Sequence, residues 1–329
     1  MNSINNTMHV SPRIKRQIPN YEELENIKKL NAIVNFDYQS TLVKTIKKTI
    51  VTKEAEVLYL VRNGAYQDGY RLKWQGHEFT IFDGPRFNSS YQYSITLNPK
   101  DFPCFASYVD FLSSITGKEI LSEQHKVTRL DIAFTSPEEV ITPALIHYCT
   151  HAKWKRRTSA YMQGKVDFEK GRISGVRTNS RSMNLSSYRK PSSKEKLQIE
   201  DLTRFEFQLK GASIKSLNLS TLNNLRWIDS SKLFKRIEFY DLQKTTAQSV
   251  NDLLAFNTFQ EDVLALGFQN ARILHNKHRN FHRNIGKFLV PLTINSGKAS
   301  LSYALRKRFN QWAKKWFNTE DDLHFLSDY

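Results

Sequence analysis

Two segments of this chain repeat one short pattern, and that pattern limits the fold more than any other feature. Residues 126–135 read KVTRLDIAFT and residues 201–210 read DLTRFEFQLK. Apolar and polar residues alternate in both, which is the period of a β-strand with two unlike faces. The apolar faces would be Leu130, Ile132 and Phe134 in the first strand, and Phe205, Phe207 and Leu209 in the second. The pattern therefore predicts two strands that each present one arginine and one acid on the face opposite the core.

The arginine–acid pairs are Arg129 with Asp131 and Arg204 with Glu206, and a third copy at 234–241 (FKRIEFYD) adds Arg236 with Glu238. One interpretation is the solvated face of an ordinary antiparallel sheet. The other is a surface that gathers carboxylates, which is what a divalent cation needs. Asp131, Glu206 and Glu238 are thus the candidate ligands for Mg²⁺ or Mn²⁺, because these ions prefer carboxylate, phosphate and water oxygens.

Charge indicates the partner. The 329 residues hold 49 Lys and Arg against 32 Asp and Glu, a formal net charge of +17, and 12% of them are aromatic. This mixture favours a nucleic-acid partner, whose phosphates would bind to the cations and whose bases would stack on the aromatic rings. Two cysteines fit a reducing compartment, and neither a long apolar run nor a signal peptide is visible. We expect a cytoplasmic, nucleic-acid-binding protein with no membrane partner.

The sequence lacks the motifs of several common classes of enzyme and metal-binding protein. The sequence has no glycine-rich phosphate loop, no cysteine pair spaced for zinc and no serine nucleophile elbow. It also lacks a His–apolar–His pair of the kind that holds a metal in many single-strand nickases. Nucleotide-driven motors, zinc proteins and serine hydrolases are therefore disfavoured.

The order of strand and helix patterns predicts an α+β fold with antiparallel sheets of ferredoxin-like or RRM-like split βαβ units, followed by a helical C-terminal region. Helices are expected at 104–117, ended by Gly117, at 142–152 and at 299–317. We divide the chain into a polar N-terminal arm (1–45), an α+β domain (46–241) and a basic helical DNA-binding region (242–329).

Basic residues cluster in the last third of the chain and between the two acidic strands. In 274–284, His275, His278 and His282 share one helical face and are a metal candidate, but the surrounding positive charge favours phosphate. The 299–317 helix has core positions at helical spacing and a basic opposite face. The DNA-binding candidates are Arg129, Arg204, Lys153, Lys155, Arg156, Arg157, Arg177, His278, Arg279, Arg283, Arg306, Lys307, Arg308, Lys314 and Lys315.

The order of these motifs resembles that of rolling-circle replication initiators of the Rep_trans type, and filamentous-phage initiators and relaxases of some integrative elements look similar. An Arg–apolar–Asp strand is followed about 75 residues later by an Arg–apolar–Glu strand that ends in Leu-Lys-Gly. Between them, NSRSMNLSSYRK (179–190) is similar to the family's Gly-Ser-Arg-x-Ser loop and Tyr-x-Lys strand. Upstream, the stretch that begins GYRLKWQGHEF resembles the family's hairpin region. The resemblance covers roughly residues 60–215, and it implies that the α+β domain at 46–241 is initiator- or nickase-like.

The resemblance implies binding to a replication origin and nicking of one strand. A tyrosine hydroxyl would attack the phosphodiester, stay joined to the 5′ end and leave a 3′-OH primer, assisted by a divalent metal. It assigns Asp131 and Glu206 as metal ligands and places Arg181 and Lys190 near the phosphate. Single- and double-stranded origin DNA is the implied partner, with a helicase and a second copy of the chain as further candidates.

The sequence departs from the family at the nucleophile. The family tyrosine falls near Arg177 here, and the second acid expected four residues after Asp131 is Thr135. Tyr188 matches the later Tyr-x-Lys tyrosine, and Tyr161 is an alternative in a basic stretch. A third alternative is that no tyrosine attacks.

Three functions therefore remain open. The first is a metal-dependent DNA nickase that starts rolling-circle replication. The second is an origin-binding initiator without nicking activity that recruits replication machinery, which the missing family tyrosine favours. The third is an RNA-binding protein built on RRM-like units, although the paired aromatic motifs of an RRM are absent.

Overall fold

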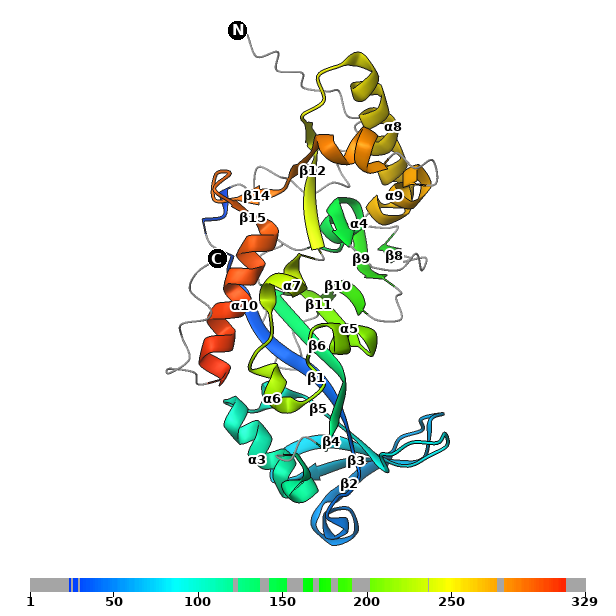
Figure 1. Cartoon of the computed structure of the whole chain (residues 1–329), viewed down its shortest axis with the longest axis vertical. Coiled ribbons are helices and arrows are strands. Elements are labelled where there is room, and N and C mark those ends of the chain that lie inside the picture. The colour runs from blue at the N-terminus through cyan, green and yellow to red at the C-terminus, as the bar shows by residue number, and fades with distance from the viewer. Residues whose placement is uncertain are drawn as a thin grey trace.

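The protein is described by a computed structural model of the whole chain. Its described residues are 24, 26–28, 30–120, 124–136, 142–152, 162–167, 172–178, 183–190, 202–235, 237–276 and 281–317. Among these residues the fold is α+β, with a large antiparallel sheet and helices concentrated toward the C-terminal end (Figure 1). The predicted fold class is confirmed.

Ten of the described strands form one antiparallel sheet in the order β2-β3-β4-β5-β1-β6-β11-β10-β9-β8. The two repeated segments form the strands β6 and β11, as their alternating sequences predict. The structure shows that these two strands pair with each other near the middle of the sheet. The strands are β1 (Ile33–Val43), β2 (Glu56–Leu60), β3 (Tyr66–Trp74), β4 (His77–Pro85), β5 (Tyr93–Leu97), β6 (Lys126–Ser136), β8 (Met162–Asp167), β9 (Arg172–Thr178), β10 (Met183–Lys190) and β11 (Leu202–Lys210).

A split βαβ unit occupies the centre of the sheet. Helix α3 (Phe105–Thr116) connects β5 to β6, and β1 lies between these two strands, antiparallel to both. Phe105, Tyr108, Phe111, Leu112 and Ile115 form the buried face of α3. The helix ends where Gly117 takes a φ of 72°, which a glycine adopts without strain.

The structure corrects the N-terminal end of the proposed division. Residues 1–45 are predicted to be a polar arm, yet 33–43 form β1, a central strand. The reason is the pattern around Val34 and Phe36, whose side chains are buried in the core. A bulge between Phe36 and Tyr38 interrupts the alternation and hides it from a search for regular strands.

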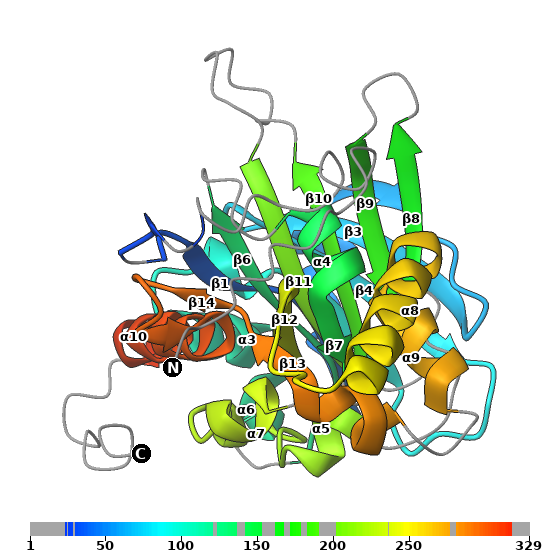
Figure 2. The same cartoon turned by 90° about the horizontal axis from the view of Figure 1, so that it is seen from above.

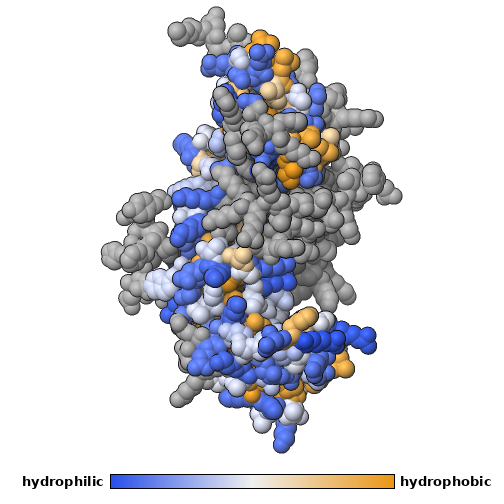
Figure 3. Space-filling model, turned by 45° about the vertical axis from the view of Figure 1, so that its right-hand side comes forward, coloured by the Kyte–Doolittle hydropathy of each residue, from blue (hydrophilic) through white to orange (hydrophobic). Residues whose placement is uncertain are grey.

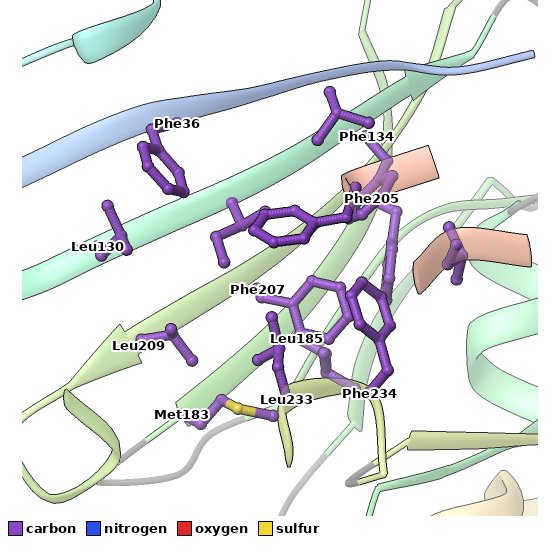
Figure 4. Close-up of a cluster of buried hydrophobic side chains, with 14 of the residues drawn as sticks. Phe36, Leu130, Phe134, Met183, Leu185, Phe205, Phe207, Leu209, Leu233 and Phe234 are labelled. Atoms are coloured by element: carbon purple, nitrogen blue, oxygen red, sulfur yellow. The ribbon is translucent and has the colours of Figure 1, made fainter. Parts of the chain in front are cut away.

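The apolar face of the sheet is packed with aromatic rings (Figure 4). The ring centroid of Phe36 lies 4.8 Å from that of Trp312 and 5.1 Å from that of Trp316, both on helix α10 (Leu301–Phe317). Phe207 on β11 packs against Phe234 at 5.4 Å. Burying each large ring contributes about 2–3 kcal/mol, so this layer anchors α10 to the sheet.

The remaining described elements cover this face or extend beyond it (Figure 2). β12 pairs with β13 and β7 in a separate three-stranded sheet, and β14 pairs with β15. These strands are β7 (Thr150–Ala152), β12 (Ile237–Thr245), β13 (Leu289–Pro291), β14 (Thr293–Ile294) and β15 (Ala299–Ser300). The other helices are α4 (Pro143–Cys149), α5 (Ala212–Ser216), α6 (Leu222–Leu225), α7 (Ser230–Phe234), α8 (Val250–Leu266) and α9 (Phe268–Asn276), and shorter turns lie at Ile50–Glu54, Pro99–Asp101, Gly117–Ile120, Phe281–Ile285 and Gly286–Phe288.

The helices predicted at 104–117, 142–152 and 299–317 correspond to α3, α4 and α10, and α4 is shorter than expected because its last residues enter β7. Exposed hydrophobic residues lie at both ends of the molecule, on α8 and α9 at one end and on β2 at the other (Figure 3). Within the described residues, no helix has the length and apolar character needed to cross a membrane.

Candidate functional site

The polar face of the sheet brings the two arginine–acid pairs together. In the register of β6 and β11, Glu206 lies opposite Ala133, and Gln208 lies opposite Asp131. Asp131 and Glu206 are therefore diagonal neighbours on one face, a spacing that long side chains can bridge. The prediction that both acids point away from the core is confirmed, since Phe205, Phe207 and Leu209 pack on the other face.

Asp131 is held by its own strand. Arg129 Nε donates to Asp131 Oδ1 at 2.9 Å, and Arg129 Nη2 donates to Oδ2 at 2.5 Å. The guanidinium also lies 4.0 Å from the ring centroid of Tyr38 on β1. Burial raises the pKa of Asp131, and the hydrogen bonds and charge of Arg129 offset only part of that effect.

Glu206 is the most connected acid of the site. Its Oε1 accepts from Arg204 Nε at 2.6 Å and from the hydroxyl of Tyr188 at 2.7 Å, and its Oε2 accepts from Ser186 Oγ at 3.3 Å. Tyr188 and Ser186 come from β10, where Tyr188 lies directly opposite Arg204. Burial, followed by the hydrogen bond to Glu206 and its charge, raises the pKa of Tyr188. The phenol is thus protonated, with its proton directed at a carboxylate.

Asp37 is a member of this site that sequence reasoning missed. It falls at the bulge of β1, where its side chain forms an ion pair with Arg204 and another with Lys100, whose Nζ lies 2.5 Å from Asp37 Oδ1. Burial alone would raise the pKa of Asp37, but the hydrogen bond from Lys100 and the charge of Arg204 outweigh it, so the pKa lies below its ordinary value. The one sequence signal was the broken alternation at 36–38.

The charges within this cluster balance. Asp37, Asp131 and Glu206 are matched by three cations, Arg129, Arg204 and Lys100. Arg204, Asp131 and Glu206 are buried, so each depends on its partner: removing that partner would leave a buried charge uncompensated. We refer to these six residues together with Tyr188 as the polar-face cluster.

The fit of a divalent metal to this cluster is poor as the side chains stand. Both oxygens of Asp131 accept from Arg129, and Glu206 accepts three hydrogen bonds. Across the described part of the chain, no group of three or more His, Cys, Asp or Glu side chains is placed to hold a metal ion. Two neighbouring guanidinium groups also oppose a cation. Metal dependence therefore stays a prediction.

Glu238, the third candidate ligand, lies elsewhere. Its strand β12 sits on the apolar side of the large sheet, where Phe239 packs against Phe205 with ring centroids 6.4 Å apart. Glu238 accepts a hydrogen bond from the hydroxyl of Tyr240 at 2.5 Å. The structure does not bring Glu238 together with Asp131 and Glu206, because its strand belongs to another sheet.

The other predicted residues are either placed on a described element, held in an ion pair, or outside the described residues. Lys190 ends β10, Arg177 lies in β9, and Arg283 lies in the turn Phe281–Ile285. His275 pairs with Asp262, its Nε2 lying 2.7 Å from Asp262 Oδ2. Outside the described residues lie Tyr161, Arg181, Lys153, Lys155, Arg156, Arg157, His278 and Arg279.

The basic side chains of α10 are not on the polar face. The helix packs on the Phe36 side of the sheet, so its cations and the polar-face cluster face different ways. Arg308 Nε donates to the backbone oxygen of Ala32 at 2.6 Å and so ties α10 to the chain before β1. Lys307 and Lys315 are exposed, and Lys314 is partly so.

Comparisons with known proteins give few matches. No protein-family model matches the chain, and no curated protein does. Among solved structures, a rolling circle replication initiator protein from Geobacillus stearothermophilus is similar, with a TM-score of 0.42 and 12% identity over 72% of this chain and 98% of that one. A likeness at this level carries no functional conclusion, so the function of this chain has to be argued from the geometry of its polar-face cluster.

Proposed function

We propose that this chain is a DNA replication initiator that binds origin DNA and nicks one strand through attack by Tyr188. The observation that supports the proposal most is the 2.7 Å hydrogen bond from the Tyr188 hydroxyl to Glu206, beside the guanidinium of Arg204. A nucleophile hydroxyl, an acceptor for its proton and a phosphate-binding cation are the parts that such a reaction needs. The net charge of +17 supports a polyanionic substrate.

The proposed reaction is a transesterification at phosphorus. The Tyr188 oxygen bonds to phosphorus while its proton passes to Glu206, and the bond from phosphorus to the 3′ oxygen breaks. The released 3′ oxygen takes a proton from water and becomes the primer end, and the 5′ phosphate stays on the tyrosine. Burial and Glu206 raise the pKa of Tyr188, so the attacking group starts as the protonated phenol, and Glu206 is placed to accept its proton. Arg204 is buried and paired with Glu206 and Asp37, so it would offset charge on the phosphoryl oxygens through its field and not by direct contact.

A second candidate is an origin-binding initiator without nicking activity. The charge balance of the polar-face cluster favours it, because every described acid there already has a cationic partner. A structural network of this kind would hold the sheet together while DNA binds to basic surfaces elsewhere. A helicase or a second copy of the chain would then act after origin binding, and both stay proposals.

The test uses purified full-length protein and 5′- and 3′-labelled single-stranded oligonucleotides tiled over the DNA molecule that encodes the chain. Reactions run with Mg²⁺, with Mn²⁺ or with a chelator, and a denaturing gel reports both cleavage and any covalent adduct. A 3′-OH product with a protein-linked 5′ fragment supports nicking, and its loss with chelator supports metal dependence. Tight, salt-sensitive binding to origin duplex without cleavage would replace nicking by the second candidate.

A further inference from the structure

Two connections of the large sheet lie side by side and project from one end of it, residues 61–65 between β2 and β3 and residues 86–92 between β4 and β5 (Figure 1). We refer to these two segments as the sheet tip. The ring of Phe87 stands on the tip and is 73% exposed. A single exposed ring is common on protein surfaces, so its meaning depends on how it is supported and on the charge around it.

The segment that carries Phe87 is held by the neighbouring connection. The backbone N–H of Arg86 donates to Ala65 O at 2.9 Å, and Arg86 Nε donates to Tyr66 O at 3.0 Å. Below these bonds the ring of Tyr66 stacks on that of Phe82, with centroids 5.6 Å apart and planes 27° apart. Phe87 is therefore displayed on a fixed support, and not at the end of a free loop.

The sheet tip carries positive charge and no acid. Its two segments read VRNGA and RFNSSYQ. Arg62 and Arg86 are both exposed, and neither takes part in an ion pair within the described part of the chain. Two arginines beside one projecting ring suit a phosphate backbone, to which a guanidinium binds by charge and by paired hydrogen bonds.

An aromatic ring on a firm basic support fits duplex DNA in a particular way. Proteins that bend DNA insert Phe, Leu or Ile side chains between two base pairs, and cations beside the wedge bind the phosphates. Rings that stack on the bases of single strands instead lie in a groove that follows the strand. Because Phe87 projects from the end of the sheet, insertion into a duplex is the mode that its position favours.

The sheet tip lies well away from the polar-face cluster. Through the strand pairing, Glu206 is level with Asn35 of β1, and β1 reaches the tip end of the sheet at Val43. That length of strand covers about 26 Å, and the strand spacings between β11 and β4 add about 19 Å sideways. The tip is therefore roughly 30–40 Å from the cluster, which is about one turn of B-form DNA.

We propose that the sheet tip is a second DNA contact, at which Phe87 inserts between two base pairs of duplex DNA while Arg62 and Arg86 bind the flanking phosphates. The proposal rests on the proposed function, because it takes origin DNA as the ligand, but it does not depend on strand nicking. Unstacking the duplex about one turn from the cluster would bend or open it, and so help to present a single strand to Tyr188.

The experiment uses full-length protein and duplex fragments tiled over the DNA molecule that encodes the chain. Fluorescence anisotropy measures affinity, and permanganate with diethyl pyrocarbonate detects thymines and adenines that have left the stack. Phe87→Ala should lower duplex affinity about tenfold and abolish the modification, because it removes the wedge. Phe87→Leu, which keeps an apolar wedge, should retain most of both. The control Trp227→Ala, which truncates a 58% exposed ring between α6 and α7, should change neither.

The arginines are tested by salt dependence. Arg62→Gln and Arg86→Gln should each weaken binding at every duplex and reduce the slope of log affinity against log salt by about one. Thermal melting establishes that each variant is folded before binding is measured. Slopes unchanged in both variants would remove the phosphate contacts from the proposal.

Three results would overturn the wedge. They are modification that survives in Phe87→Ala, a duplex that wild-type protein binds without unstacking any base, and a loss of affinity in Phe87→Ala that is equal for single strands and duplex. Each of these leaves the proposed function standing. If wild-type protein binds none of the duplex fragments, the proposed function fails together with the wedge.

Discussion

The chain contains two acid–tyrosine pairs that share one kind of hydrogen bond but differ in strand arrangement and in surroundings. Glu206 accepts from Tyr188 across two strands of the large sheet, at 2.7 Å, and Glu238 accepts from Tyr240 two positions along one strand, at 2.5 Å. Glu206 also forms an ion pair with Arg204, which in turn pairs with Asp37, so Glu206 belongs to a network of balanced charges. Glu238 instead lines an open pocket.

The difference shows what the repeated Arg–apolar–acid pattern does and does not specify. The pattern specifies alternation, and hence that an acid and an arginine share one face of a strand. Which sheet receives the strand depends on packing partners far along the chain, as with Phe239 on Phe205. One pattern therefore supports a buried charge network in one place and a carboxylate that lines a pocket in the other.

The largest expected effect comes from removing the shared cation of the network. Arg204→Met leaves Glu206 and Asp37 without their guanidinium, and the Arg204 side chain is only 3% exposed. We expect a loss of about 3–5 kcal/mol in the free energy of unfolding, measured by urea denaturation. The comparison change Arg306→Met, in the pocket that Glu238 also lines, should cost about 1 kcal/mol or less. Equal losses would remove the distinction between the two regions.

Neutralising the acids should give the next largest contrast. Glu206→Gln replaces an acceptor of three hydrogen bonds and leaves Arg204 facing an amide, so we expect a loss of about 2–3 kcal/mol. Glu238→Gln should cost about 1 kcal/mol, because one tyrosine hydroxyl can still donate to the amide oxygen. Chemical denaturation of the two variants in parallel decides this, and a larger loss at Glu238 would reverse the comparison.

The acids of the network should make the stability of the fold depend on pH. The pKa of Asp37 is lowered by its cations, so its contribution to stability is present above its ordinary value of 3.8 and is lost as pH falls through the folded-state pKa. Asp37→Asn should therefore destabilise clearly at about pH 7 and much less at about pH 3. Unfolding curves at both pH values provide the measurement. Asp131, whose pKa is raised, contributes with the opposite sign, losing stability as pH rises through its folded pKa.

The smallest effect on stability is expected from the two tyrosine hydroxyls. Tyr188→Phe and Tyr240→Phe each remove one donor to a carboxylate, and each should cost about 1 kcal/mol by thermal or chemical unfolding. Their effects on DNA should diverge completely: only Tyr188→Phe is expected to abolish strand nicking. Nicking lost in both variants, with both folded, would contradict the separation of the two sites.

Much of the sheet was predictable from local pattern. The alternation in 126–135 and 201–210 predicted β6 and β11 and the faces of their arginines and acids, because strand periodicity is a local property. The buried positions of α10 followed from helical spacing for the same reason. Strand β1 was missed because its bulge breaks the alternation at Asp37.

Which residues make up the site was harder to predict from the sequence. Asp37 pairs with Lys100, 63 residues away in the chain, and also with Arg204, and neither Asp37 nor Lys100 belongs to a motif. Glu238 shares the motif but not the sheet, since pairing with β7 and β13 decides its place. The hydrogen bond between Tyr188 and Glu206 depends on the register of β10 against β11, which no pattern within either strand encodes.

The proposal that Tyr188 is the nucleophile is tested by identifying the residue that becomes linked to DNA. After reaction with origin oligonucleotides, the covalent adduct is isolated, digested with protease and nuclease, and its modified peptide is sequenced by mass spectrometry. We expect a nucleotide on the peptide that contains Tyr188, and no adduct from Tyr188→Phe. A nucleotide on any other residue, such as Tyr161, would contradict the assignment of the polar-face cluster as the nicking site.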